Sequence, residues 1–217
     1  MKRSASSKQW LQRHVNDPYV QRSKKEGYRA RSAYKLIEID DRDRLLAPGA
    51  LVVDLGAAPG GWTQVAAKRI GPAGRIVAID LLEMAPVPGS VFIRADFASA
   101  AGLAAVEQAL GGSQAGVVLS DMAPNISGIA ISDQARSMAL AELARDFALA
   151  RLKPGGAFLV KVFQGAGYDE FLRSLRAAFD KVAVRKPDAS RGESNELYLL
   201  ARGPKTPQAP PFSPPPT

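Results

Sequence analysis

Short apolar runs alternate with longer stretches of mixed polarity along most of the chain. Runs at residues 50–55, 75–80, 90–94, 116–120 and 157–163 are typical of buried strands, because they leave no polar face. We expect helices between these runs and two further strands after them. The expected helices lie near residues 31–37, 61 onward, 100–110, 133–152 and 169–179, and the last strands near 181–185 and 196–201. This alternation predicts an α/β fold, a seven-stranded and mostly parallel sheet with helices on both faces.

A glycine-rich turn, DLGAAPGGW at residues 54–62, follows the first expected strand. Gly56, Gly60 and Gly61 permit positive φ angles and let a ligand approach the backbone. The free N–H groups at the start of the next helix would point toward that ligand. The turn therefore indicates a nucleotide-like ligand, although an ordinary βα turn has the same local pattern.

The spacing of this turn discriminates between ligands. A dinucleotide fingerprint needs glycine where Ala58 stands, and the P-loop lysine is replaced by Trp62. Pyrophosphate is therefore a poor candidate. Asp54, at the entrance of the turn, favours a ligand with a cationic or amine-bearing part, such as the methionine moiety of S-adenosylmethionine.

Two further acidic residues lie at the ends of the next two expected strands. Asp80 follows the glycines by about 20 residues, a position suited to ribose hydroxyls. Asp96 and Phe97 place a carboxylate beside an aromatic ring, which would suit an adenine amine and base. Asp96 alone would equally suit a cap on the next helix. Three acids at three successive strand ends favour a binding site.

Composition fits one domain with a substantial core. The 217 residues are 46% hydrophobic, and no uncharged apolar run reaches 18 residues, so we expect no membrane span. The chain has no Cys and one His, His14, so we expect neither a disulfide scaffold nor a metal site. Proline and small polar residues dominate the end of the chain. We expect a basic extension over 1–30, a main domain over 31–202 and a disordered tail over 203–217.

The net charge of +8 is concentrated at the amino end. Residues 1–31 hold nine basic residues against two acidic ones, interleaved with three aromatic rings. Such a segment fits an RNA surface, where phosphates meet basic side chains and unpaired bases stack on rings. A merely solvated face and an organelle transit peptide are the alternatives. The candidate RNA-binding residues are Arg22, Lys24, Lys25, Arg29 and Arg31.

Lys161 and Asp121 place charges within or directly after apolar strands. A buried charge costs several kcal/mol unless it is paired. A structural ion pair would satisfy this requirement as well as a catalytic site would, so these two residues alone leave both interpretations open.

Five stretches, taken together, resemble the FtsJ/RrmJ family of ribosomal RNA ribose 2′-O-methyltransferases. They are RSAYKL at 31–36, the glycine turn at 54–62, SDMAPN at 120–125, LVKVFQG at 159–165 and ELY at 196–198. The resemblance extends over roughly residues 2–202 in unbroken order. It implies a Rossmann-like, S-adenosylmethionine-dependent methyltransferase fold, in which the last strand runs antiparallel.

The resemblance also implies site residues. The catalytic set of the family falls on Lys35, Asp121, Lys161 and Glu196. Lys161 would orient the ribose hydroxyl and stabilise the developing alkoxide, Asp121 and Glu196 would position Lys161, and Lys35 would help to hold the target nucleotide. Glu193 is a rival to Glu196, which we prefer because it opens an apolar strand. The candidate cofactor-binding residues are Asp54, Gly56, Pro59, Gly60, Gly61, Trp62, Asp80, Asp96, Phe97 and Asp121.

The function implied by the resemblance is methylation of a uridine in 23S rRNA, in the A-loop of the assembled 50S subunit. We expect a cytoplasmic monomer that uses S-adenosylmethionine and binds neither metal nor membrane. The alternatives are a 2′-O-methyltransferase for tRNA or mitochondrial rRNA, a non-catalytic ribosome assembly factor, and a small-molecule methyltransferase. The basic amino end disfavours a small-molecule substrate, and the complete set of four candidate catalytic residues disfavours a non-catalytic role.

Overall fold

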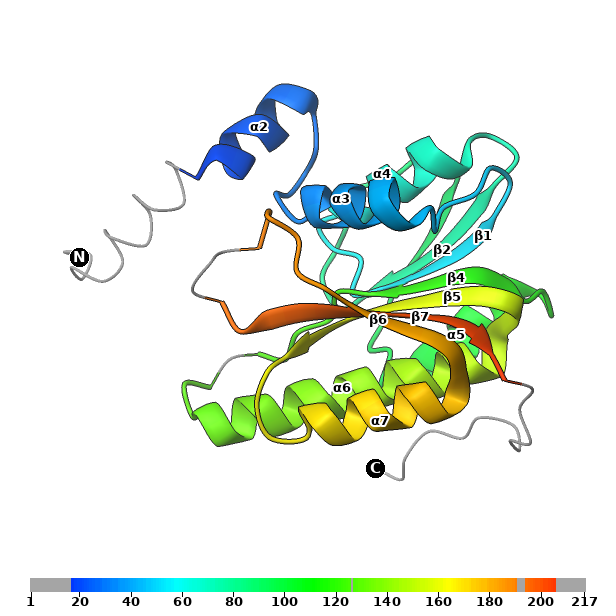
Figure 1. The fold of residues 1–217 in the computed structure, drawn as a ribbon. Coiled ribbons are helices and arrows are strands. Elements are labelled where there is room, and N and C mark those ends of the chain that lie inside the picture. The colour runs from blue at the N-terminus through cyan, green and yellow to red at the C-terminus, as the bar shows by residue number, and fades with distance from the viewer. Residues whose placement is uncertain (1–16, 126, 191–193, 206–217) are drawn as a thin grey trace.

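The computed structural model describes residues 17–125, 127–190 and 194–205. These residues form one seven-stranded sheet with helices on both faces (Figure 1). In chain order the elements are α2 (Pro18–Glu26), α3 (Ala33–Asp43), β1 (Leu51–Leu55), α4 (Gly61–Ile70), β2 (Arg75–Asp80), β3 (Ser90–Arg94), α5 (Ala100–Leu110), β4 (Ala115–Ser120), α6 (Ala130–Arg151), β5 (Leu152–Phe163), α7 (Tyr168–Ala178), β6 (Phe179–Arg185) and β7 (Glu196–Pro204). The predicted α/β fold is confirmed.

The strands lie in the order β3-β2-β1-β4-β5-β7-β6. The first five are parallel to one another, whereas β7 runs antiparallel between β5 and β6. The parallel strands therefore end at one edge of the sheet, which carries Asp80, Asp121 and the glycine turn. The strand order reverses at β1, and ligands of open α/β sheets collect outside the strand ends at such a point.

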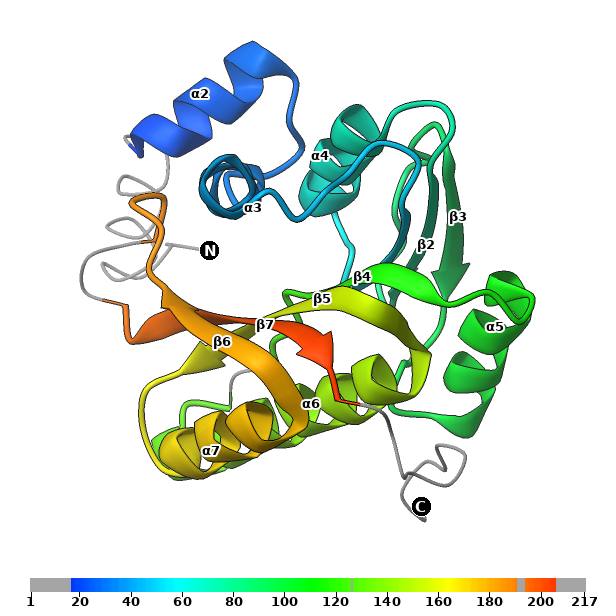
Figure 2. The same cartoon turned by 45° about the vertical axis from the view of Figure 1, so that its right-hand side comes forward.

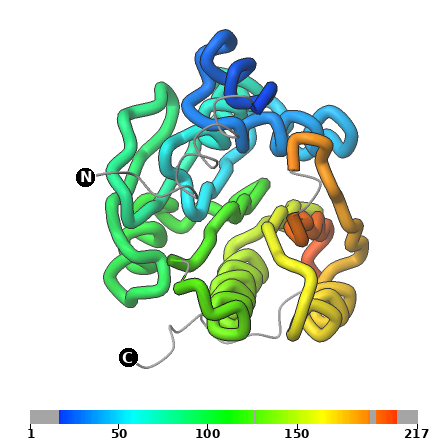
Figure 3. Tube along the Cα trace, turned by 90° about the vertical axis from the view of Figure 1, so that its left-hand side faces the viewer, coloured from blue at the N-terminus to red at the C-terminus, as the bar shows by residue number. Residues whose placement is uncertain are grey.

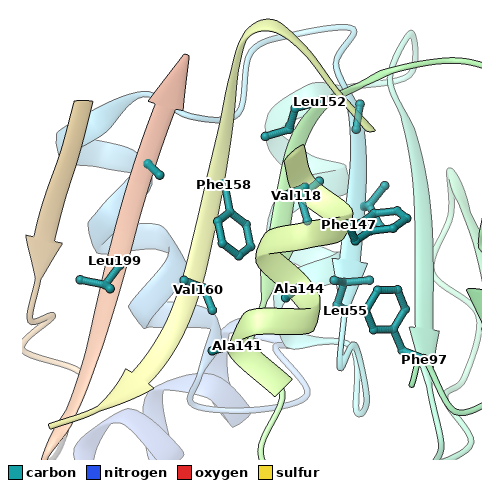
Figure 4. Packing of buried hydrophobic residues seen from close by; sticks show 14 of the residues in the cluster. Leu55, Phe97, Val118, Ala141, Ala144, Phe147, Leu152, Phe158, Val160 and Leu199 are labelled. Atoms are coloured by element: carbon teal, nitrogen blue, oxygen red, sulfur yellow. The ribbon is translucent and has the colours of Figure 1, made fainter. Parts of the chain in front are cut away.

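Helices cover both faces of the sheet (Figure 2), and an apolar core lies on each face. Helices α5, α6 and α7 pack on one face, where Phe97, Phe147 and Phe158 are buried beside the strands (Figure 4). Helices α3 and α4 pack on the other face with Trp62 and Tyr198. Burial on both faces explains why the central strands read as continuous apolar runs.

Helix α2 lies inside the basic segment and was not expected from its polar sequence. Its ends carry local signals: Asp17 accepts a hydrogen bond from the backbone of Tyr19, Pro18 is the first helical residue, and Gly27 ends the helix at φ 76°. These capping residues are the signal from which helix α2 could have been predicted from the sequence. The first 16 residues of the predicted basic extension lie outside the described residues.

Other boundaries also differ from expectation; α3, for example, continues to Asp43. Helix α6 begins three residues before Asp133, whose carboxylate accepts hydrogen bonds from the backbone of Ser127 and Gly128 and so holds the preceding loop against the first turn. Strand β5 begins at Leu152, before the turn at 153–156 that was expected to precede it. Strand β7 continues through Pro204, two residues beyond the expected domain boundary. The remainder of the expected tail, 206–217, lies outside the described residues.

The amino-terminal part of the described chain packs beside the segment that joins β6 to β7 (Figure 3). Arg31 donates hydrogen bonds to Asp17 and to the backbone carbonyl of Ala189, and Glu38 accepts one from the Ala189 amide. None of the helices described here is long and apolar enough to cross a membrane.

Substitution of Phe158 tests the core between the sheet and helices α5, α6 and α7, which is the larger of the two cores. Its side chain is fully buried, and its ring stacks on Phe179 with centroids 6.3 Å apart. We expect Phe158→Ala to lower the free energy of unfolding by about 3–5 kcal/mol, because it removes buried area and leaves a cavity. Val91→Ala, at a half-exposed position of edge strand β3, should change it by only about 0.5 kcal/mol. Chemical denaturation measures both, and equal losses would contradict the described core.

Candidate active site

Lys35 and Glu196 form an ion pair at the edge of the sheet. Helix α3 carries Lys35 over the first residue of β7, and Lys35 Nζ lies 2.6 Å from Glu196 Oε1. Ser190 Oγ donates to the same oxygen at 3.0 Å. Burial alone would raise the pKa of Glu196, but the Lys35 ammonium, with smaller contributions from Lys161 and Ser190, lowers the net pKa below its ordinary value. Glu196 is therefore ionised at neutral pH. Glu193, its sequence rival, lies outside the described residues.

Lys161 and Asp121 form the second pair. Lys161 is only 9% exposed, and its Nζ lies 2.6 Å from the backbone oxygen of Asp121 and 3.1 Å from Asp121 Oδ1. The ammonium thus contacts both the carboxylate and the carbonyl of one residue. Because buried charges are expensive without a partner, this contact explains how a lysine is tolerated within an apolar strand.

Tyr198 connects the two pairs and was not predicted as a site residue. Its hydroxyl donates to Asp121 Oδ1 at 3.0 Å, and Lys35 Nζ lies 5.6 Å from its ring centroid. Burial, followed by the nearby charges of Asp121 and Glu196, raises the pKa of Tyr198 well above its ordinary value. The phenol therefore stays a hydrogen-bond donor. The sequence signal was its position two residues after Glu196, which places both on one face of β7.

The structure thus brings all four predicted catalytic residues together. They come from α3, the end of β4, β5 and β7, and form two ion pairs around Tyr198. A cavity of about 190 Å³ opens beside them, lined by Arg31, Lys35, Ser194 and Glu196.

The glycine turn between β1 and α4 has positive φ angles at two of its three glycines. Gly56 has φ +79° and Gly60 has φ +108°, both in the region that favours glycine. A Cβ at Gly56 would lie 2.8 Å from Met122 Cγ, and one at Gly60 would lie 2.6 Å from Arg29 Nη1. At these two positions the missing side chain makes room for other parts of the protein. Gly61 starts α4, and the peptide bond before Pro59 is cis.

Asp54 lies fully buried beneath this turn. Its Oδ2 accepts a hydrogen bond from Thr63 Oγ1 at 2.7 Å, whereas Oδ1 is buried without a hydrogen-bond partner. Burial raises the pKa of Asp54 to about 7. The orphaned carboxylate oxygen is of a kind that would suit an amine such as that of a methionine moiety, and the role of Asp54 toward such a ligand stays a prediction.

Asp80 supports the backbone of the turn. Asp80 Oδ2 accepts from the Ala58 amide at 2.9 Å, and Oδ1 accepts from the Leu82 amide at 2.8 Å. Both oxygens therefore already bind backbone groups at the point where β2 ends. Leu81 and Leu82 follow directly and are 58% and 68% exposed, which leaves apolar surface at this edge of the sheet.

The two predicted aromatic contacts are turned into the protein. Trp62 is 3% exposed, and its Nε1 donates to the Ser32 carbonyl at 2.8 Å. The Phe97 ring packs edge-on against Phe147, with the ring centroids 5.3 Å apart. Phe97 was expected to cover the base, but its ring is part of the core beneath α5, α6 and α7. Asp96 accepts from the Ala98 amide, while Ser99 caps α5, so capping does not depend on Asp96.

The five predicted RNA-binding residues separate into two groups. Arg29 donates to the carbonyls of Pro59, Ala85 and Pro86, and Arg31 binds Asp17 and Ala189, so both guanidinium groups hold parts of the protein together. The others lie on exposed α2, where Arg22 pairs with Glu26 at 2.7 Å, and Lys24 and Lys25 occupy the last turn.

Within residues 17–205, leaving out the undescribed gaps, no group of three or more His, Cys, Asp or Glu side chains is placed to hold a metal ion.

The strand order, the antiparallel β7 and the turn after β1 define a Rossmann-like, S-adenosylmethionine-dependent methyltransferase. A Streptococcus mutans protein designated a methyltransferase and solved with S-adenosylhomocysteine has the same fold, with a TM-score of 0.51 and 13% identity over 78% of this chain and 97% of that one.

Sequence comparison defines the family more narrowly. Residues 28–204 match the sequence model of the FtsJ-like methyltransferases. "Ribosomal RNA large subunit methyltransferase E" of Azoarcus sp. (strain BH72) is 60% identical over 200 residues, which cover 92% of this chain and 98% of that protein. A Plasmodium falciparum structure designated a ribosomal RNA methyltransferase has a TM-score of 0.72 and 27% identity, over 82% of this chain and 98% of that one. The chain belongs to the FtsJ-like methyltransferase family, as its motifs predicted.

Asp54 gives a pH-dependent test. Because its folded pKa of about 7 lies above the ordinary 3.8, the folded state holds the proton more tightly, and stability falls as pH rises from about 4 to 7. Asp54→Asn removes this loss. We expect Asp54→Asn to melt above the wild type by a margin that grows from pH 5 to pH 8. At pH 8 the difference in the free energy of unfolding should be on the order of 2–4 kcal/mol.

S-adenosylmethionine provides the second measurement for this variant. Its amine would partner Asp54 Oδ1, so at pH 8 the cofactor should stabilise the wild type more than Asp54→Asn in the same melting assay. Glu142→Gln, an exposed neutralisation on α6, controls for the change in net charge. A pH-independent difference between Asp54→Asn and the wild type would contradict the assignment.

Proposed function

We propose that this protein transfers the methyl group of S-adenosylmethionine to the ribose 2′ oxygen of a uridine in 23S rRNA, in the A-loop of the 50S subunit. The observation that carries the proposal is the arrangement of Lys161. An ammonium has three N–H donors, one of which binds the backbone oxygen of Asp121, while the Asp121 carboxylate lies 3.1 Å away. The described residues provide no further hydrogen-bond partner for Lys161 Nζ, so an N–H is available to an oxygen of the substrate.

The chemistry follows from the charges around this ammonium. The sulfonium of S-adenosylmethionine supplies an activated methyl group, so most of the rate gain comes from holding donor and hydroxyl in line. The hydroxyl proton would pass to solvent as S-adenosylhomocysteine leaves. The Lys161 ammonium, positioned by Asp121 and Glu196, would donate a hydrogen bond to the developing alkoxide. Tyr198 fixes the Asp121 carboxylate that orients it.

Lys35 has a separate role in this scheme. Its ion pair with Glu196 places a positive charge at the mouth of the site, where Arg31 also lies. The Lys35 ammonium suits the backbone of the nucleotide that enters, whereas the Arg31 guanidinium is already bound by Asp17 and Ala189. Lys35 would therefore hold the target nucleotide, as the family resemblance implies.

Large-subunit rRNA is the substrate that the relatives favour. The Azoarcus relative is named for that substrate, and its similarity extends over nearly both whole chains. The exposed cations of α2 supply a surface for phosphates beside the site. We propose that the protein acts as a monomer in the cytoplasm. Methylation assays with 50S subunits, free 23S rRNA and tRNA distinguish this substrate from the alternatives.

Lys161→Ala tests the mechanism. We expect turnover on 50S subunits to fall by about 10²–10³-fold, because the hydrogen bond that stabilises the developing alkoxide is lost. Binding of S-adenosylmethionine, measured by calorimetry, should stay within about twofold. The matched control is Lys153→Ala, an exposed lysine at the opposite end of β5. Turnover near that of the control would remove Lys161 from the mechanism.

Reversing the charge of Lys24 and Lys25 tests the RNA surface. The double change to Glu should weaken binding to large-subunit rRNA. The slope of log affinity against log salt concentration should become shallower by roughly 0.7–0.9 for each phosphate contact that is lost. Lys153→Glu, at the far edge of the sheet, is the control. A salt slope equal to that of the control would show α2 to be a solvated face.

A further inference from the structure

A second cavity lies beside the catalytic residues and has no part in the proposed mechanism so far. Its volume is about 270 Å³. It lies between the loop after β4, the first two turns of α6 and the end of β5. Its lining includes Ala123, Pro124, Phe163, Gln164 and Asn195.

The position of this cavity follows from chain connectivity. Ala123 lies two residues after Asp121, Phe163 two residues after Lys161, and Asn195 directly before Glu196. Three segments that carry catalytic residues therefore continue into the walls of the cavity. Whatever fills it lies within the length of one nucleotide from the atoms proposed to react.

The walls are held in place without any ligand. Gln134 Nε2 donates to the carbonyls of Phe163 and Ala166, at 3.2 and 2.9 Å. The backbone N–H of Gln164 donates to the backbone carbonyl of Asn195 at 2.9 Å. These bonds join α6, β5 and the start of β7 around a preformed space.

The charges of the cavity exclude a phosphate. No lysine or arginine lines it among the described residues, and Asp133 is an acid. Hydrogen bonds from the backbone and side chain of Ser127 lower the pKa of Asp133 to about 2, so this carboxylate is ionised at all ordinary pH values. Arg136, outside the lining, pairs with this carboxylate at 2.5 Å, so the lining itself offers no cation that could bind a phosphate.

The remaining chemistry suits a nucleobase. Ala123, Pro124 and Phe163 supply apolar surface for a flat ring. The side-chain amides of Gln164 and Asn195 make no hydrogen bond within the described part of the chain, and each offers donors as well as an acceptor. The edge of a base presents donors and acceptors in the same way, and proteins read unpaired RNA bases through stacking and edge contacts.

We propose that this cavity receives the base of the nucleotide whose ribose is methylated, and that Gln164 and Asn195 bind its edge. The proposal rests on the proposed function. It adds a base-reading site, so selection of the target would depend on the identity of its base as well as on the surrounding RNA.

Occlusion of the cavity is the first test. Ala130 lines it at the start of α6, and we expect Ala130→Leu to lower kcat/KM on 50S subunits by at least tenfold, mainly through KM. Ala139→Leu makes the same change at an exposed position of the same helix, outside the lining, and should stay within twofold of the wild type. Calorimetry with S-adenosylmethionine should give wild-type affinity for both variants, which also shows that they fold.

Base identity is the second test. The wild type should methylate 50S subunits with uridine at the target position at least tenfold faster than subunits with cytidine there, because a site that hydrogen-bonds one base leaves polar groups unpaired with another. Gln164→Ala and Asn195→Ala should bring this ratio close to one.

The outcomes separate the two proposals. A wild type that does not methylate 50S subunits would overturn the proposed function and the base assignment with it. A wild type that turns over, with Ala130→Leu equal to Ala139→Leu, would overturn the base site alone. Weaker cofactor binding by Ala130→Leu with an unchanged KM for 50S subunits would assign the cavity to the cofactor and also overturn the proposal.

Discussion

Burial of the Lys161 ammonium is the constraint on which the rest of the site depends. An unpaired charge at this depth would cost several kcal/mol, and Asp121 offsets that cost with both its carboxylate and its carbonyl. Asp121 is fixed in turn by Tyr198. Because these residues belong to the end of β4, to β5 and to β7, the compensation requires the strand order β4-β5-β7. Strand β7, which runs antiparallel between β5 and β6, therefore completes the site around Lys161.

A second set of contacts joins the basic segment to the glycine turn. The Arg29 guanidinium donates to the carbonyls of Pro59, Ala85 and Pro86, and the Gln64 side chain binds the backbone of Gly27 and Arg29. The end of α2 is thus attached to both loops at the end of β1 and β2. The surface proposed for RNA and the turn proposed for the cofactor are held in a fixed relation by these contacts.

Much of the fold and part of the site followed from local patterns. The expected spans of β2, β3 and α5 agree with the structure, because continuous apolar runs and capping residues are local signals. The four predicted catalytic residues do converge. Tyr198 was missed because a tyrosine in an apolar strand looks like an ordinary core residue. Arg29 and Arg31 look like RNA contacts in the sequence, although the acceptors for their guanidinium groups lie in segments far along the chain.

The sequence by itself determined the seven strands, the helices from α3 onward, where the backbone needs glycine, which charges interrupt apolar strands, and the family. These features depend on neighbouring residues or on recognisable motifs. Only the tertiary structure decided which charges pair, that Phe97 and Trp62 face the cores, and that a preformed cavity lies beside the segment that follows Asp121. Those outcomes depend on strand order and on packing between distant segments, because a side chain's partner is set by the element that lies against it.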